Sequence, residues 1–256
     1  MTGRGPALLL LAHGSRDPRH AATVRALTAR VRAAAPGLPV SFGFLDLALP
    51  RAERVLAELS AAGHREVVAV PLLLNRAFHA TTDIPALLAR QRDRLPGLTV
   101  WQSEVLGPHP LLTRTLERRL AEANGGPLTD RSATGVVLAS AGTSAPAGRA
   151  ALERLADGWR AAGGWGAVVS AYASASAPDP AFAVRALRAD GLRRVVVAPY
   201  VIAPGRLPDR IEAGAREAGA DLLAPVLGAA PELARLVLRR YRATVGARPR
   251  AVPLAG

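Results

Sequence analysis

Residues 7–14 read Ala-Leu-Leu-Leu-Leu-Ala-His-Gly, and residues 135–142 read Gly-Val-Val-Leu-Ala-Ser-Ala-Gly. Each stretch is a short apolar run that ends at a glycine, which is typical of a buried strand followed by a tight turn. The same offset of 128 residues (14 to 142) also aligns three further pairs of Gly or Pro: Pro50 with Pro178, Gly63 with Gly191, and Pro71 with Pro199. An offset that holds through four such positions indicates an internal duplication.

Short apolar runs alternate with amphipathic stretches rich in arginine and alanine throughout both halves. This alternation predicts an α/β fold with two duplicated, doubly wound parallel-sheet domains. In the first half we expect strands at 7–12, 39–46, 66–74 and 98–101, and helices at 18–35, 50–62, 84–94 and 110–123. In the second half we expect strands at 135–139, 166–173, 193–202 and 221–224, and helices at 146–162, 178–190, 207–218 and 231–245.

The repeat also sets the expected domain boundaries. The first domain spans residues 1–123 and the second spans residues 134–246. The segment 124–133 combines Gly-Gly-Pro with polar residues and is the expected linker. The tail 247–256 is rich in proline and arginine, and we expect it to be disordered. Each half is long enough to bury a core of its own.

The composition excludes several kinds of chemistry. All 33 basic residues are arginine, and the chain has neither lysine nor cysteine. A phosphate-binding P-loop and a Schiff-base mechanism both require lysine, so we expect no nucleotide to take part. Without cysteine there is no disulfide, no thiol nucleophile and no thiolate metal site. Any metal ion must therefore be held by His, Asp or Glu.

The chain shows no pattern typical of a membrane or nucleic-acid protein. Its apolar runs fall short of the roughly 20 residues that cross a bilayer, so we expect a cytoplasmic protein without a membrane partner. The net charge of +13 raises nucleic-acid binding as an alternative. A basic arm, aromatic stacking platforms and a recognition helix are all missing, which argues against it. A hydrolase is excluded because the chain has no Gly-x-Ser-x-Gly elbow.

Three ionisable residues follow predicted strands of the first half. His13 follows the first strand, Asp46 ends the second, and His79 lies in the loop after the third. Because the carboxyl ends of parallel strands meet at one edge of a sheet, we expect the three to share a pocket. The repeat does not preserve them, since the offset places them on Ala141, Ser174 and Leu207. One half is therefore expected to hold the working site and the other to support it.

Two imidazoles and a carboxylate form a ligand set suited to Fe(II), Co(II), Ni(II) or Zn(II). With an unperturbed pKa of about 6.5, the same imidazoles can instead accept protons from a weakly acidic N–H. The residues alone leave both roles open. Of the other candidates, His20 and His64 are interpreted as ordinary surface residues and Asp83 as a helix N-cap. His109 belongs either to a loop that closes over the site or to a turn that starts a helix.

Three motifs together resemble a known family. They are Leu-Ala-His-Gly-Ser-Arg-Asp-Pro at 11–18, Phe-Leu-Asp at 44–46 with Pro50, and Val-Pro-Leu-Leu-Leu at 70–74 followed by His79 and Asp83-Ile84-Pro85. They look like the class II tetrapyrrole chelatases, and in particular the sirohydrochlorin chelatases of the sirohaem and cobalamin pathways. The resemblance covers nearly the whole chain, including Ala-Pro-Gly-Arg-Leu at 203–207.

This resemblance implies ATP-independent insertion of a divalent metal ion, Co(II), Fe(II) or Ni(II), into sirohydrochlorin. It implies that His13 and His79 hold the metal or take the two pyrrole protons, with Asp46 as a further metal ligand. The macrocycle would lie in a central cleft between two chelatase-like domains. One-repeat members of the family pair as homodimers, so this chain would be a monomer that forms a pseudo-dimer internally.

The chain departs from the family pattern at two places. Asp46 stands where relatives commonly have Glu, and the shorter carboxylate would bind through water or shift the metal preference. Asn75-Arg76-Ala77-Phe78 stands where relatives carry small, Gly-rich residues.

The substrate is anionic, so the arginines in these loops are candidates for its binding. We expect Arg16, Arg76 and Arg206 to bind its carboxylates, and Arg19 lies in the same set of loops. Phe78 is expected to stack on the ring or to pack under it. A non-catalytic tetrapyrrole or metal carrier on the same fold is the alternative function.

Overall fold

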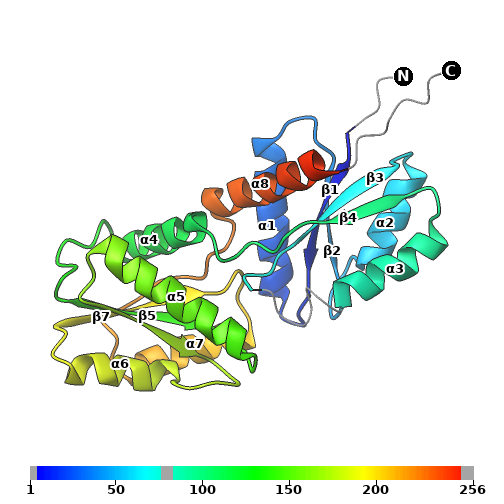
Figure 1. Cartoon of the computed structure of the whole chain (residues 1–256). Helices are drawn as coiled ribbons and strands as arrows, with labels where there is room; N and C mark the ends of the chain where they lie inside the picture. Colours follow the sequence, from blue (N-terminus) through cyan, green and yellow to red (C-terminus); the bar gives the residue numbers. More distant parts are fainter. Residues whose placement is uncertain (1–4, 76–82, 249–256) are drawn as a thin grey trace.

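A computed structural model describes residues 5–75 and 83–248. The described chain forms two four-stranded parallel sheets, one in each half (Figure 1). The first sheet has the strand order β2-β1-β3-β4, and the second repeats it as β6-β5-β7-β8. The strands of the first sheet are β1 (Ala7–Ala12), β2 (Val40–Phe44), β3 (Glu66–Pro71) and β4 (Thr99–Gln102). Those of the second are β5 (Thr134–Ser140), β6 (Ala167–Tyr172), β7 (Arg194–Tyr200) and β8 (Leu222–Leu223).

Helices alternate with these strands, which confirms the predicted α/β fold class. The first half contains α1 (Pro18–Ala34), α2 (Ala52–Ala61), α3 (Ile84–Arg94) and α4 (Pro110–Asn124). The second contains α5 (Pro146–Gly163), α6 (Pro180–Ala189), α7 (Arg206–Glu217) and α8 (Pro231–Ala247). The largest error in a predicted end is at β3, which ends at Pro71 rather than at Leu74. Pro71 pairs with Leu11, and the neighbouring strand β1 ends one residue later.

The central strand of each sheet needs a continuous apolar run because both of its faces are covered. In β1 all six residues are buried, and the strand pairs with β2 on one side and β3 on the other. Leu8 and Leu10 belong to the core that includes α1, whereas Leu9 and Leu11 belong to the core that includes α2. The run at 7–12 therefore supplies both faces of the first sheet.

The backbone repeats in the same places as the sequence. Gly14 and Gly142 have φ of 102° and 103°, and Gly63 and Gly191 have φ of 85° and 84°. The pattern extends to non-glycine residues, since Leu47 has φ of 60° and Ala175, at the same offset, has φ of 61°. The two halves are thus copies in backbone conformation, which confirms the duplication.

The last helix of each half packs on the other half. In Figure 1, α4 lies with the second sheet, where it contacts β7 and β8, and α8 lies with α1 and β3 of the first half. The two exchanged helices also contact each other. The predicted domains 1–123 and 134–246 follow the sequence repeat and miss this exchange. In space, α4 belongs with the second sheet and α8 with the first.

The exchange produces one apolar core that is continuous between the halves. It contains Leu8 and Leu10 of the first sheet, Val136 and Leu138 of the second, and buried residues of both exchanged helices. The outer face of each sheet has a separate core, under α2 and α3 in the first half and under α6 and α7 in the second. Burial of shared apolar surface therefore holds the halves together as one body.

The C-terminal end of α8 lies against the first half. Helix α8 reaches Ala247, and the guanidinium of Arg248 lies 2.6 Å from the carboxylate of Glu66. Ala247 and Arg248 belong to the predicted disordered tail 247–256, so the first part of this tail is ordered against the first sheet. Within the described part of the chain, no helix is long and apolar enough to cross a membrane.

Candidate functional site

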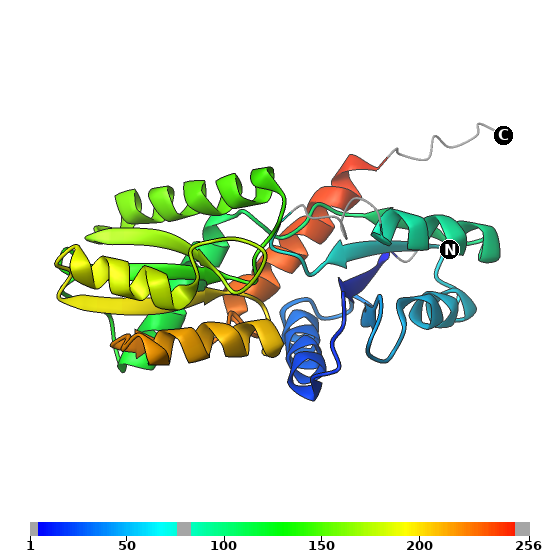
Figure 2. The same cartoon turned by 90° about the horizontal axis from the view of Figure 1, so that it is seen from below.

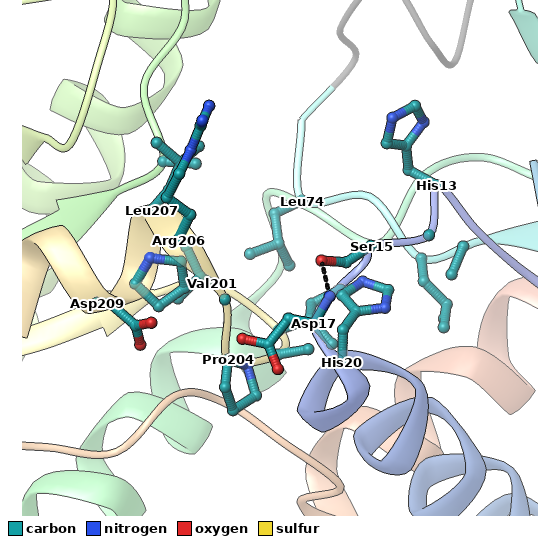
Figure 3. A pocket seen from close by; sticks show the side chains of 18 of the residues that line it. His13, Ser15, Asp17, His20, Leu74, Val201, Pro204, Arg206, Leu207 and Asp209 are labelled. Atoms are coloured by element: carbon teal, nitrogen blue, oxygen red, sulfur yellow. Dashed lines mark hydrogen bonds between the residues drawn. The ribbon is translucent and has the colours of Figure 1, made fainter. Parts of the chain in front are cut away.

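A cavity of about 1220 Å³ lies between the two halves (Figure 3). Its wall is formed by the segments that follow β1 and β3 in the first half and β5 and β7 in the second. These are the carboxyl ends of the central strands, where parallel sheets present their ligand sites. The cavity therefore stands where the sequence predicts the pocket, with one wall from each copy of the repeat.

His13 lines this cavity directly after β1. Its position depends on Gly14, whose φ of 102° is rarely adopted by residues that have a side chain. A Cβ at Gly14 would overlap the carbonyl oxygen of Asp46. The two loops are also joined by a hydrogen bond of 2.8 Å, which the Asp46 N–H donates to the carbonyl of His13. The fold thus brings His13 and Asp46 to the same edge of the sheet.

The Asp46 side chain is exposed and paired with Arg51, whose Nη1 lies 2.5 Å from Oδ1. The hydrogen bond from Arg51 holds the pKa of Asp46 below its usual value, and the Leu47 N–H and the charge of His13 act in the same direction. Asp46 does not itself line the cavity, although Leu47 does. A metal ion would therefore have to compete with Arg51 for this carboxylate.

Three of the predicted site residues, Arg76, Phe78 and His79, lie outside the described residues. Their roles in metal binding and substrate binding stay predictions. Among the residues that the structure describes, no three His, Asp or Glu side chains are grouped closely enough to hold a metal ion. The described residues therefore leave the proposed ligand set of His13, Asp46 and His79 a prediction.

Arg16 and Arg206 both line the cavity, from opposite halves. Arg16 follows β1, and Arg206 is the first residue of α7. Neither forms an ion pair with a carboxylate of the described residues. Arg210, one turn further along α7, also lines the cavity, and the sequence did not single it out. Positive charge on facing walls is suited to a ligand with carboxylates around its rim.

His20 is not the ordinary surface residue that the sequence suggested. It lines the cavity, and its ring centroid lies 5.9 Å from that of Phe44. Burial lowers the pKa of His20 below its usual value, and the nearby charge of His13 lowers it further. Two signals were available in the sequence. His20 is one turn before the buried residues of α1, and the repeat replaces it with Gly148.

Arg19 joins the two halves at one edge of the cavity. Its Nη2 lies 2.6 Å from an oxygen of Asp17, which caps α1, and 2.6 Å from an oxygen of Asp209 in the first turn of α7. Both carboxylates line the cavity. In Figure 2 the blue helix α1 and the gold helix α7 approach each other at this place. We call this group of three residues the edge clasp.

The second half also contributes Tyr200, at the end of β7. Its side chain lines the cavity, but the hydroxyl is buried against the segment around Gly107 of the first half. Burial raises the pKa of Tyr200 well above its usual value, so the phenol stays neutral. The sequence did not single out this residue.

Two remaining predictions concern helix starts. His109 accepts a hydrogen bond of 3.1 Å at Nδ1 from the Leu111 N–H and so caps α4, and it does not line the cavity. The helix-initiating interpretation is thereby confirmed. Asp83 occupies the N-cap position of α3, but its side chain makes no capping hydrogen bond.

Comparisons with known proteins agree with this architecture. The CbiX family model matches twice, at residues 7–123 and 135–244. A sirohydrochlorin ferrochelatase of Priestia megaterium is 27% identical over 240 residues, 92% of this chain and 89% of that protein. A sirohydrochlorin cobaltochelatase of Methanococcoides burtonii is 30% identical over 123 residues, 45% of this chain and 94% of its own length. That relative is therefore about one repeat long.

Among solved structures, SirB from Bacillus subtilis with Fe3+ superposes with a TM-score of 0.81 at 24% identity, covering 94% of this chain and 96% of that one. At this level of identity the likeness establishes the fold. The two family matches cover both repeats and leave out only the linker and the ends. The chain therefore belongs to the CbiX family, with two copies of the family's unit in one polypeptide.

Proposed function

We propose that this protein inserts a divalent metal ion, cobalt(II) or iron(II), into sirohydrochlorin without consuming a nucleotide. The observation that carries the proposal is the cavity between the halves, which joins His13 of one repeat to arginines of both. Relatives that share both repeats or one repeat are named sirohydrochlorin ferrochelatase and cobaltochelatase. The names of these relatives identify the proposed substrate, and the cavity is the proposed place where it binds.

The size and charge of the cavity suit a tetrapyrrole. Its volume of about 1220 Å³ exceeds the roughly 300 to 1000 Å³ of ordinary small-molecule pockets. Arg16 stands on one wall and Arg206 on the other, and neither is neutralised by a described carboxylate. In our proposal the carboxylates at the rim of the ring pair with these guanidinium groups, so that the centre of the ring lies near His13.

Metal insertion exchanges one dication for two protons on the pyrrole nitrogens. Each of these protons needs an acceptor, and the incoming ion needs ligands that release it again. Imidazole can fill either role, because it is neutral near physiological pH and binds borderline metal ions. We assign His13 and His79 to these two tasks and Asp46 to the approach of the metal.

We further propose that the protein works as a cytoplasmic monomer. Each half supplies one wall of the cavity, and the exchanged helices fuse the halves through a common core. A relative of one repeat's length would need two copies to build the same cavity. Light scattering in solution tests this part of the proposal, because a monomer has a mass of 26.6 kDa.

The deciding experiment is anaerobic absorption spectroscopy of sirohydrochlorin with Co(II), Fe(II) or Ni(II) in the presence of the protein. We expect faster metallation with the wild type and loss of the acceleration in His13→Ala and in His79→Ala. His64→Ala is the matched control, because His64 lies in the turn before β3 and does not line the cavity. Binding of sirohydrochlorin without acceleration would instead establish the carrier alternative.

A further inference from the structure

One apolar side chain in the cavity wall is held in an unusual way. Leu47 lies between β2 and α2, lines the cavity and is 44% exposed. Its φ of 60° falls in the left-handed region, which residues with a Cβ adopt only at a cost. Neither the exposed leucine nor its backbone conformation is expected to stabilise the fold.

The exposure of Leu47 does not come from a loosely held loop. The backbone on either side is tied down by three hydrogen bonds: Phe44 N–H to Pro50 at 2.9 Å, Leu45 N–H to Ala12 at 2.9 Å and Asp46 N–H to His13 at 2.8 Å. Close contact between Gly14 and the Asp46 carbonyl fixes the same loop against the one that carries His13. The leucine is therefore presented at the cavity by a well-anchored backbone.

The second repeat shows which part of this arrangement belongs to the fold. Ala175 is the counterpart of Leu47 and has nearly the same φ, 61°. The left-handed conformation is thus built into both repeats and needs no functional explanation. The side chain is different, because the second repeat has alanine at this position and Ala175 does not line the cavity. A large apolar group is present only in the repeat that carries His13 and Asp46.

We propose that Leu47 is a substrate-contact residue that packs against the apolar face of the tetrapyrrole ring and positions the ring beside His13. The proposal rests on the proposed function, since it takes the macrocycle to be the ligand. A conjugated ring has a flat apolar face and, in this substrate, an anionic rim. Arg16 and Arg206 suit the rim, whereas Leu47 offers exposed apolar surface that the ring would remove from water.

The test separates substrate contact from a structural role with two variants: Asn tolerates the left-handed conformation but removes the apolar surface, and Met keeps the apolar surface. Leu47→Asn keeps a similar size, and Asn adopts this backbone conformation more readily than Leu. We expect its melting temperature to equal or exceed that of the wild type, and its Kd for metal-free sirohydrochlorin to rise about tenfold. Leu47→Met should restore binding, because it replaces the apolar surface.

Kinetics give a second readout. If Leu47 contacts the ring equally in the ground state and the transition state, Leu47→Asn raises the KM for sirohydrochlorin and leaves kcat and the KM for Co(II) nearly unchanged. Two control variants change residues that resemble Leu47 in one respect but do not line the cavity. Leu49→Ala alters a neighbouring leucine that is 71% exposed and does not line the cavity, and Ala175→Gly relieves the same backbone conformation in the other repeat. Both should bind sirohydrochlorin like the wild type.

The outcomes are distinct. Unchanged sirohydrochlorin affinity in Leu47→Asn, with an active wild type, overturns the inference and leaves the proposed function standing. If Leu47→Asn has a lowered melting temperature and Leu47→Met does not bind sirohydrochlorin like the wild type, Leu47 has a structural role. That result also overturns the inference. A wild type that neither binds nor metallates sirohydrochlorin refutes the proposed function and the inference together.

Discussion

Arg19 of the first half and Asp209 of the second half are joined across the cavity edge, with Nη2 of the arginine 2.6 Å from Oδ2 of the aspartate. The same guanidinium holds Asp17, and its hydrogen bonds to Asp17 and Asp209 raise the pKa of Arg19 further above its usual range. All three residues of the edge clasp are partly exposed. Exposed ion pairs add little to the free energy of unfolding, so the edge clasp restrains the cavity edge only weakly.

Breaking the clasp should loosen both helix starts at once. In Asp209→Asn we expect faster amide hydrogen exchange in the first turns of both α1 and α7 and little change in melting temperature. High salt should reduce the difference from the wild type, because the pair is exposed. Glu217→Gln is the control, since it removes the same charge from α7 but breaks a pair with Arg185 inside the second half. Faster amide hydrogen exchange in α1 of the Glu217→Gln variant would contradict a specific link between Asp209 and α1.

The paired glycines give a prediction that separates fold from function. A Cβ at Gly14 would overlap the Asp46 carbonyl, and a Cβ at Gly142 would overlap the Ser174 carbonyl in the other repeat. Both Gly14→Ala and Gly142→Ala should therefore lose about 2 kcal/mol or more of unfolding free energy, measured by urea denaturation.

Only Gly14→Ala moves the loop that carries His13. In the folded protein, at equal fractions of native chains, we expect metallation to fall at least tenfold in Gly14→Ala and much less in Gly142→Ala. Equal loss of activity in the two variants would show that the halves share the chemistry.

An ion pair between a buried carboxylate and a partly exposed arginine joins the exchanged helices. Glu232 of α8 is 4% exposed, and its carboxylate lies 2.6 Å from Nη2 of Arg118 in α4. Burial alone would raise the pKa of Glu232, but the hydrogen bonds from Arg118 outweigh it, and the pKa lies below its usual value of 4.5. Stability from this group is therefore present above about pH 4.5 and is lost as the pH falls through the lower folded-state pKa.

Glu232→Gln should reduce the unfolding free energy by about 1 to 2 kcal/mol at pH 7. The difference in unfolding free energy between wild type and variant should shrink as the pH falls through the lowered folded-state pKa of Glu232, because the wild-type carboxyl becomes protonated there too. Urea titrations at several pH values measure it. A gap that stays constant with pH would mean that shape, rather than charge, accounts for the loss.

His20 also makes the protein less stable as the pH falls, but over a higher pH range than Glu232. Burial and then the charge of His13 lower the pKa of His20, with Asp17 acting weakly in the other direction. Below its unfolded-state pKa of about 6.5, the unfolded chain binds this proton more readily than the folded one, so the group lowers stability as the pH falls. His20→Gln should therefore gain stability relative to the wild type between pH 7.5 and pH 5. An NMR titration of the His20 ring checks the cause, and a midpoint above 6.5 would refute it.

Much of the secondary structure could be predicted because it depends on local chemistry. Helix α3 begins at Ile84, ahead of Pro85, and ends at Arg94 as expected, and β1 follows its apolar run from Ala7 to Ala12. Pro at a first helical turn and apolar runs between breakers are signals carried by neighbouring residues. The position of the cavity was predictable for a related reason, since carboxyl ends of parallel strands share an edge.

The errors have a different origin. Periodicity shows that α4 and α8 each have an apolar face, but it does not show which sheet that face covers. His20 was misjudged because a polar residue was read by its type rather than by its place on the face that contains Val24 and Leu27. The edge clasp could not be predicted, because Arg19 and Asp209 are 190 residues apart in sequence.

The sequence by itself determined the duplicated α/β scaffold, the half that carries His13 and Asp46, and the loops around the cavity, because strands, turns and helix starts depend on residues close together in the chain. Tertiary structure decided the exchange of α4 and α8, the cavity wall at His20 and Tyr200, and the tie between Arg19 and Asp209. These features arise from packing and charge pairing between distant segments, and such contacts exist only after the two sheets have been brought together.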